Sequence, residues 1–214
     1  GVSFNVHEGE ILALLGRNGA GKTSTLRAIA RLGDPEIKHG EIWLDHQPLH
    51  SMTSYEAAGA GLGLVPEDRR IIAGLTVEEN LQLAQIAPPI GWSIERIYEL
   101  FPRLGERRKQ EGVTLSGGEQ QMLAMARILR TGANVLLLDE ITEGLAPVIV
   151  DKLAEVLIEL KTRGYTVLLV EQNFRFAAPL ADRHFIMDHG NVAAVIHKDE
   201  LEEKQHVFDE YLSV

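Results

Sequence analysis

The stretch GRNGAGKT at residues 16–23 follows a continuous apolar run at residues 11–15 and precedes a segment in which apolar residues recur at helical spacing. Glycines in such a turn let consecutive backbone N–H groups point at one anion, because no Cβ atom shields them. A helix that begins near Lys22 brings its positive end to the same place. The strand, the G-x-x-x-x-G-K-T turn and the helix together are typical of a phosphate-binding loop, or P-loop. A chance glycine-rich turn is the alternative.

This loop predicts a nucleotide site. In a P-loop the lysine, here Lys22, reaches the β- and γ-phosphates, and the following hydroxyl, here that of Thr23, binds Mg²⁺. The residues expected to bind the nucleotide are Gly16, Arg17, Asn18, Gly19, Ala20, Gly21, Lys22, Thr23 and Ser24. Kinases, GTPases and ATPases share such a loop, so other residues must decide the reaction.

Short apolar runs alternate with helical patterns along the chain. Strands are predicted at residues 2–6, 11–15, 41–44, 62–65, 135–138, 166–170 and 185–187, with a hairpin around residues 189–191. Helical patterns dominate residues 76–130, where Thr76 and Glu79 have the spacing of a capping box, and return at residues 151–163. We therefore expect an α/β fold over a single domain, residues 1–214. It has a P-loop NTPase core with a mainly parallel sheet, a small antiparallel β subdomain and an inserted helical lobe at about residues 76–130.

The composition limits the class of protein and its partners. The 214 residues are 45% hydrophobic and 24% charged, as in an ordinary folded protein, and the apolar runs are strand-sized. None is long enough to span a bilayer, so a membrane role is expected to be peripheral. There is no cysteine, which fits an intracellular compartment, and the net charge of -10 argues against a nucleic-acid partner.

Two adjacent acids end the predicted strand at residues 135–138. Asp139, at the tip of a buried strand, can hold through water the Mg²⁺ that bridges the phosphates. Glu140 beside it can orient and deprotonate the attacking water as a general base. Strand ends often carry exposed acids, so the pair is informative only together with the P-loop. Together they indicate nucleotide hydrolysis.

The segment LSGGEQ at residues 115–120 narrows the class further. Ser116 has the position of a helix N-cap, and Glu119 that of its capping-box partner. Gly117 and Gly118 leave the first N–H groups of the helix open to a phosphate. A helix start that is merely well capped is the alternative.

The P-loop, LSGGEQ and the Asp139-Glu140 pair follow one another in the order found in the ATP-binding cassette family. The sequence resembles this family from residue 1 to residue 214. The resemblance implies an ATPase that uses ATP and Mg²⁺ and works as a head-to-tail dimer with a second cassette. In such a dimer Ser116, Gly117 and Gly118 act on the nucleotide of the partner cassette. The resemblance also implies transmembrane permease partners at the cytoplasmic face of the cell membrane, and through them a substrate-binding protein.

Two catalytic positions depart from the usual pattern of that family. Glu67 lies where most cassettes have the glutamine that links the γ-phosphate, the metal and the transmembrane partner, so the resemblance implies a catalytic and metal-side role for Glu67. Gln172 lies where most have a histidine that contacts the γ-phosphate; glutamine can donate a hydrogen bond but cannot titrate. Ala146 replaces a common aspartate, and Ile141 a usual proline whose loss has no mechanistic reading.

Five segments resemble the subgroup of cassettes that imports branched-chain amino acids: residues 65–70 (VPEDRR), 74–81 (GLTVEENL), 143–147 (EGLAP), 170–173 (VEQN) and 211–212 (YL). The predicted function is therefore to power the uptake of branched-chain or related small amino acids through a separate permease, which docks around residues 67–86. A urea or short-amide importer and a soluble cassette outside transport are the alternatives. Cassettes of this family begin with strands and an adenine-stacking aromatic residue that precede the first residues of this chain, so the native protein is expected to extend further.

Overall fold

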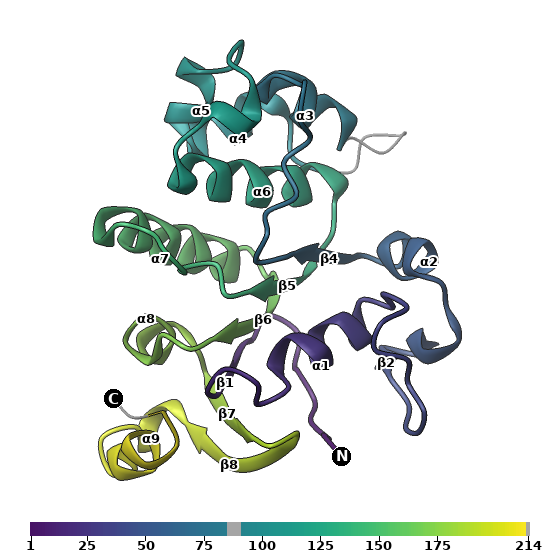
Figure 1. Cartoon of the computed structure of the whole chain (residues 1–214), viewed down its shortest axis with the longest axis vertical. Helices are drawn as coiled ribbons and strands as arrows, with labels where there is room; N and C mark the ends of the chain where they lie inside the picture. The colour runs from purple at the N-terminus through teal and green to yellow at the C-terminus, as the bar shows by residue number, and fades with distance from the viewer. Residues whose placement is uncertain (85–90, 213–214) are drawn as a thin grey trace.

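The computed structural model describes residues 1–84 and 91–212, which form a six-stranded sheet flanked by helices (Figure 1). The strands are β1 (Ile11–Leu15), β4 (Leu62–Val65), β5 (Val135–Asp139), β6 (Thr166–Glu171), β7 (Arg183–Asp188) and β8 (Asn191–His197). They lie in the order β4-β5-β6-β1-β7-β8, and every pair is parallel except the β7–β8 hairpin. A small antiparallel sheet pairs β2 (Trp43–Leu44) with β3 (Gln47–Pro48). The predicted α/β fold with a mainly parallel sheet is confirmed.

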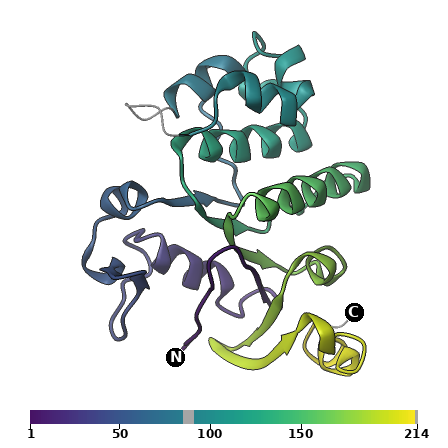
Figure 2. The same ribbon diagram turned by 180° about the vertical axis from the view of Figure 1, so that it is seen from behind.

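Helices cover both faces of the sheet. On one side lie α1 (Lys22–Ile29) and α2 (Ser54–Gly59), and on the other α7 (Pro147–Thr162) and α8 (Phe174–Leu180), as Figure 2 shows from behind. A separate layer beyond the β4 edge contains α3 (Val77–Leu83), α4 (Ile94–Leu100), α5 (Pro102–Glu106) and α6 (Gly117–Thr131). The last helix, α9 (Gln205–Leu212), lies beside β8. Short 3-10 turns occupy Leu49–Ser51, Gly112–Thr114 and Lys198–Glu200.

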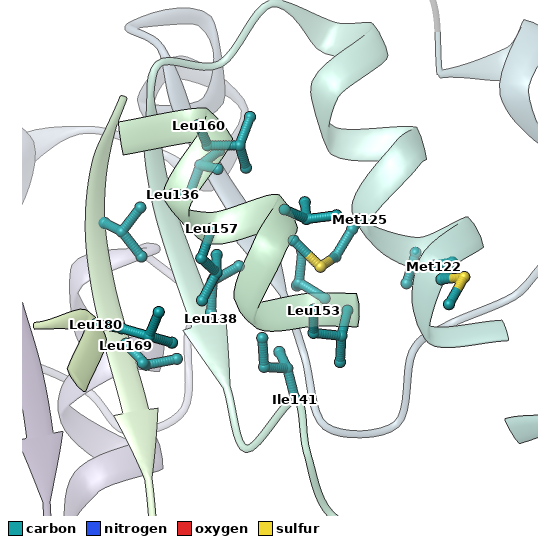
Figure 3. Close-up of a cluster of buried hydrophobic side chains, with 14 of the residues drawn as sticks. Met122, Met125, Leu136, Leu138, Ile141, Leu153, Leu157, Leu160, Leu169 and Leu180 are labelled. Atoms are coloured by element: carbon teal, nitrogen blue, oxygen red, sulfur yellow. The ribbon is translucent and has the colours of Figure 1, made fainter. Parts of the chain in front are cut away.

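The sheet separates two apolar cores, because side chains alternate between the faces of each buried strand. On β1, Ile11, Ala13 and Leu15 face the core shared with α6, α7 and α8, whereas Leu12 and Leu14 face the core under α1. All five residues are fully buried, so β1 gives the loop that follows it a rigid base. Figure 3 shows part of the first core, with side chains from α6, α7, β5 and β6: Met122, Met125, Leu153, Leu157, Leu138 and Leu169.

Local signals set the starts of several helices. The capping box at α3 is confirmed: Glu79 N donates to Thr76 Oγ1 at 3.2 Å, and Thr76 N donates to Glu79 Oε2 at 2.8 Å. The helix predicted at residues 151–163 begins earlier, at Pro147. Proline is well placed at a first helical position, because its missing N–H would have no partner there and its φ is already helical.

The strand predicted at residues 2–6 is wrong, since the structure shows no strand there. The alternation that suggested it is real: Val2, Phe4 and Val6 pack against the core under α1, and the residues between them are exposed. One backbone carbonyl of the segment, that of Asn5, accepts a hydrogen bond from the Arg183 guanidinium at 2.7 Å. Alternation decides which side chains point inward, but a strand also requires a neighbouring backbone to pair with.

Candidate nucleotide-binding site

The loop between β1 and α1 has the glycine-dependent geometry expected of a P-loop. Gly19 has a φ of 81°, and Gly21, which precedes α1, has a φ of 99°, both in the left-handed region. Gly16 serves a different need, because a Cβ atom there would lie 2.6 Å from the carbonyl oxygen of Met187 on β7. A side chain at that position would push the loop and β7 apart.

Lys22 is buried at the centre of this loop, with 4% of its surface exposed. Its Nζ donates to the carbonyl oxygens of Gly16 at 2.8 Å and Arg17 at 3.2 Å. It also forms an ion pair with Glu140 Oε1 at 3.1 Å. A charged group that is shielded from water interacts more strongly with an opposite charge than one in bulk solvent. The ammonium of Lys22 therefore suits a phosphate bound at the start of α1, and it lies next to the predicted general base.

Thr23 and Asp139 bring two hard oxygen ligands together. The Thr23 hydroxyl, at the start of α1, donates to Asp139 Oδ1, at the end of β5, at 3.0 Å. Burial raises the pKa of Asp139, although the hydrogen bond from Thr23 opposes this effect. Within residues 1–84 and 91–212, no group of three or more His, Cys, Asp or Glu could hold an ion alone. Such a pair fits Mg²⁺, which takes one or two protein oxygens and completes its shell with water and substrate phosphate.

A cavity of ≈ 340 Å³ opens in front of the loop. Its walls combine the P-loop and the start of α1 with three acids: Asn18, Gly19, Gly21, Lys22, Thr23, Ser24, Glu67, Glu140 and Glu143. Desolvation raises the pKa of Glu67, and the Glu143 carboxylate raises it further by its charge and a shared hydrogen bond. The sequence placed Glu67 at the site but gave no role to Glu143. In the sequence, Glu143 stood out only as the first residue of segment 143–147 (EGLAP), which resembles cassettes that import branched-chain amino acids.

Glu140 lies in a strained turn that packs against the end of β6. Its φ of 45° is in the left-handed region, which costs a residue with a Cβ atom about 1 kcal/mol or more. Its N–H donates to the carbonyl oxygen of Val170 at 2.9 Å.

Thr142 donates to the carboxylate of Glu171 from its N–H at 3.2 Å and from its hydroxyl at 3.0 Å. Burial raises the pKa of Glu171 to about 7. Sequence reasoning missed Glu171, because its role depends on a contact between residues that are 29 positions apart.

The start of α6 is a complete helix cap that lies outside the cavity. Glu119 N donates to Ser116 Oγ at 3.4 Å, and Ser116 N donates to Glu119 Oε2 at 3.0 Å, so the predicted capping box is confirmed. A Cβ atom on Gly118 would lie 2.8 Å from the Ile149 side chain, so this glycine also lets α6 approach α7 closely. Ser116, Gly117 and Gly118 do not line the cavity of their own chain, and Figure 1 shows the helical layer apart from the loop before α1.

The remaining predicted residues lie at the edge of the cavity or outside it. Gln172 directly follows β6, is exposed and is not one of the residues that line the cavity. Arg17 is exposed, and its guanidinium donates to the carbonyl oxygen of Glu210 in α9 at 3.3 Å. Ala20 is buried beneath the loop. The structure thus gathers Lys22, Thr23 and three acids into one pocket, and Gln172 does not line it.

The comparisons with known proteins agree on one family. The family model described as "ABC transporter" matches residues 1–143. The "High-affinity branched-chain amino acid transport ATP-binding protein BraG" of Pseudomonas aeruginosa is 41% identical over 194 residues, which cover 89% of this chain and 82% of the relative. The "Probable branched-chain amino acid transport ATP-binding protein LivF" of Archaeoglobus fulgidus is 36% identical over 200 residues, which cover 90% of this chain and 82% of the relative. Among solved structures, this chain is similar to the ATP-binding cassette MJ0796, a dimer in a post-hydrolysis state bound to ADP and Pi. The TM-score is 0.82 and the sequence identity 25%, and the match covers 92% of this chain and 89% of the MJ0796 chain.

Proposed function

This chain belongs to the ABC transporter family and is an ATPase of that family, and we propose that its ATP hydrolysis drives the uptake of branched-chain or related small amino acids through a separate permease. The similarity to two proteins named for branched-chain amino acid transport supports this substrate class. The observation that carries the chemistry is the contact of Lys22 with Glu140 at 3.1 Å, in the cavity that Thr23 also lines. It combines a phosphate-binding cation with a carboxylate that can act on water.

The residues predicted from the sequence have proposed parts in hydrolysis. The backbone of the loop and Lys22 hold the phosphates, and the Glu140 carboxylate accepts a proton from the attacking water. Thr23 and Asp139 would hold Mg²⁺, with Glu67 approaching from the facing loop; the ion, when bound, neutralises charge that develops on the phosphate oxygens. Gln172 would donate a hydrogen bond to the γ-phosphate.

The proposed assembly is a head-to-tail dimer of cassettes on a permease, at the cytoplasmic face of the membrane. Support for the dimer comes from the start of α6, which presents Ser116, Gly117 and Gly118 away from the cavity of their own chain. The described residues include no helix that is long and apolar enough to cross a bilayer. Permease docking is proposed around residues 67–86, of which residues 85 and 86 lie outside the part that the structure describes. A groove of ≈ 240 Å³ near Glu67, between β4 and α6, supports this location. Through the permease the chain would act with a substrate-binding protein.

The substitution Glu140→Gln tests the chemistry. We expect it to retain ATP binding and to lower kcat by about 100-fold or more, because a general base contributes on the order of 10²–10⁴ in rate. Equilibrium binding of a fluorescent ATP analogue and release of phosphate measure the two effects. Glu155→Gln is a matched control, since Glu155 is an exposed residue of α7 that is paired with Lys152. Hydrolysis by Glu140→Gln at the rate of this control would overturn the assignment.

The substrate class needs a separate test, because the transported molecule is proposed to pass through the permease rather than to bind this chain. A membrane protein that co-purifies with the chain can be reconstituted together with it in vesicles. Labelled leucine or urea is then supplied on the side of the membrane opposite to the chain. ATP-dependent accumulation of leucine is the expected result. Accumulation of urea without leucine would contradict amino-acid transport but would leave the ATPase assignment intact.

A further inference from the structure

The end of β6 holds the turn that carries Glu140 through a set of converging hydrogen bonds. Glu140 N donates to the carbonyl oxygen of Val170 at 2.9 Å. Thr142 N donates to Glu171 Oε1 at 3.2 Å, and the Thr142 hydroxyl donates to Glu171 Oε2 at 3.0 Å. Both carboxylate oxygens of Glu171 therefore accept hydrogen bonds from Thr142, which is two positions after Glu140. The turn is fixed to β6 on both sides of its strained residue.

Glu171 occupies an unusual place for an acid. It is 2% exposed, and its neighbours along β6 are apolar core residues. Among the ion pairs of the described residues none includes Glu171, so hydrogen bonds alone compensate its burial. A buried carboxylate held in this way costs free energy that an apolar side chain would not. This cost in free energy indicates that Glu171 holds a particular backbone geometry, because an apolar side chain would pack in the core without it.

The geometry that Glu171 holds is the strained backbone conformation of Glu140. A φ of 45° is unfavourable for a glutamate and persists only where the surroundings impose it. Thr142, two residues after Glu140 in the same turn, is anchored by both its backbone and its side chain, and it is itself buried. Without this anchor the turn could relax, and the Glu140 carboxylate would leave its position 3.1 Å from Lys22.

We propose that Glu171 is a positioning residue for ATP hydrolysis: its carboxylate anchors Thr142 to the end of β6 and so keeps the Glu140 carboxylate in the nucleotide pocket beside Lys22. The proposal rests on the proposed role of Glu140 as the base. Glu171 itself is not one of the residues that line the pocket. The hydrolysis step should therefore depend on Glu171, whereas the affinity for ATP should not.

Replacing Glu171 separates these two quantities. We expect Glu171→Ala to lower kcat by about 10- to 100-fold, the effect of a displacement near 1 Å at a catalytic group, with the Kd for ATP within about twofold. Glu171→Gln should keep most of the activity, because its amide oxygen can accept from Thr142 N and its amide nitrogen can donate to the Thr142 hydroxyl. In a Glu140→Gln background, Glu171→Ala should lower the residual rate no further, since the two residues act as one unit.

Glu10→Ala is the matched control for loss of a buried acid. Glu10 is 7% exposed and bonded to Arg183, and it precedes β1 at the end opposite the P-loop. We expect it to lower the melting temperature while kcat, measured below that temperature, stays unchanged. If Glu171→Ala does not fold, Thr142→Val replaces it: that change removes one hydrogen bond and should lower kcat several-fold at unchanged Kd.

Three outcomes would overturn the proposal. The first is a normal kcat in Glu171→Ala, or in Thr142→Val where that variant replaces it. The second is an equal loss of kcat in Glu171→Ala and Glu171→Gln. The third is a further loss of kcat when Glu171→Ala is added to Glu140→Gln. Normal hydrolysis by Glu140→Gln is a different failure, because it would remove the assigned base itself. Loss of activity in Glu140→Gln with full activity in Glu171→Ala would contradict this inference alone.

Discussion

At the scale of the residue, the pocket depends on acids held in different environments. Glu140 is paired with Lys22, whereas Glu171 is buried and accepts hydrogen bonds without a cationic partner among the described residues. Burial raises the pKa of Glu171 from 4.5 to about 7. Near neutral pH, the protonation of Glu171 therefore responds to a small change of proton concentration.

The raised pKa of Glu171 predicts a pH dependence of stability. Between pH 4.5 and about 7 the folded chain holds a proton at Glu171 that the unfolded chain has released. The free energy of unfolding should therefore fall as pH rises through this window, by up to about 3 kcal/mol from this group, and change no further above it. Urea unfolding of the wild type and Glu171→Gln at pH 5 and pH 8 measures the difference. A wild type and variant with the same pH dependence would show that Glu171 titrates normally.

Gly16 gives a second prediction at this scale. A Cβ atom at this position would meet the Met187 carbonyl oxygen at 2.6 Å, and backbone cannot yield as a flexible side chain does. We expect Gly16→Ala to lower the free energy of unfolding by about 1–3 kcal/mol, the usual cost of overpacking, and to weaken ATP binding. Gly33→Ala is the control, because nothing lies within 4 Å of a Cβ there. Equal stability of the two variants in urea would contradict the close approach.

At the scale of the element, two helix caps with the same chemistry have different proposed tasks. Thr76 caps α3, and Ser116 caps α6, each with a glutamate three residues later. Replacing either cap by alanine should lower the free energy of unfolding by about 1 kcal/mol. Only Ser116→Ala should also lower ATPase activity, because only α6 is proposed to contact a nucleotide. Equal activity in the two variants, at equal loss of stability, would make the α6 cap purely structural.

The same scale explains which parts of the fold and site could be predicted. The caps of α3 and α6 and the loop before α1 depend on residues within a few positions of one another, so their patterns sufficed. The strand predicted at residues 2–6 failed because strand formation depends on a partner elsewhere in the chain. Glu143 and Glu171 were missed for the same reason: each gains its role from a residue that only the sheet order brings near it, Glu67 in one case and Thr142 in the other.

At the scale of the whole molecule, the two features that are proposed to bind phosphate belong to different layers. The loop before α1 rests on the sheet, and the start of α6 belongs to the helical layer (Figure 1). We therefore propose that each ATP site combines the loop of one chain with the α6 start of another. The dimeric form of the MJ0796 cassette, which shares this fold, is consistent with that requirement.

Mixing two inactive variants tests this combination. Lys22→Ala disables the loop, and Ser116→Arg blocks the start of α6, so each homodimer should be inactive. A mixed dimer, however, contains one site built from the intact loop of the Ser116→Arg chain and the intact α6 start of the Lys22→Ala chain. If chains exchange at random and sites act independently, an equal mixture should recover about a quarter of the wild-type phosphate release, because half of the dimers are mixed and each has one working site. Two differently tagged chains allow the mixed dimers to be isolated by tandem affinity purification. Mixed dimers without activity would show that a single chain completes its own site or that both sites must work together.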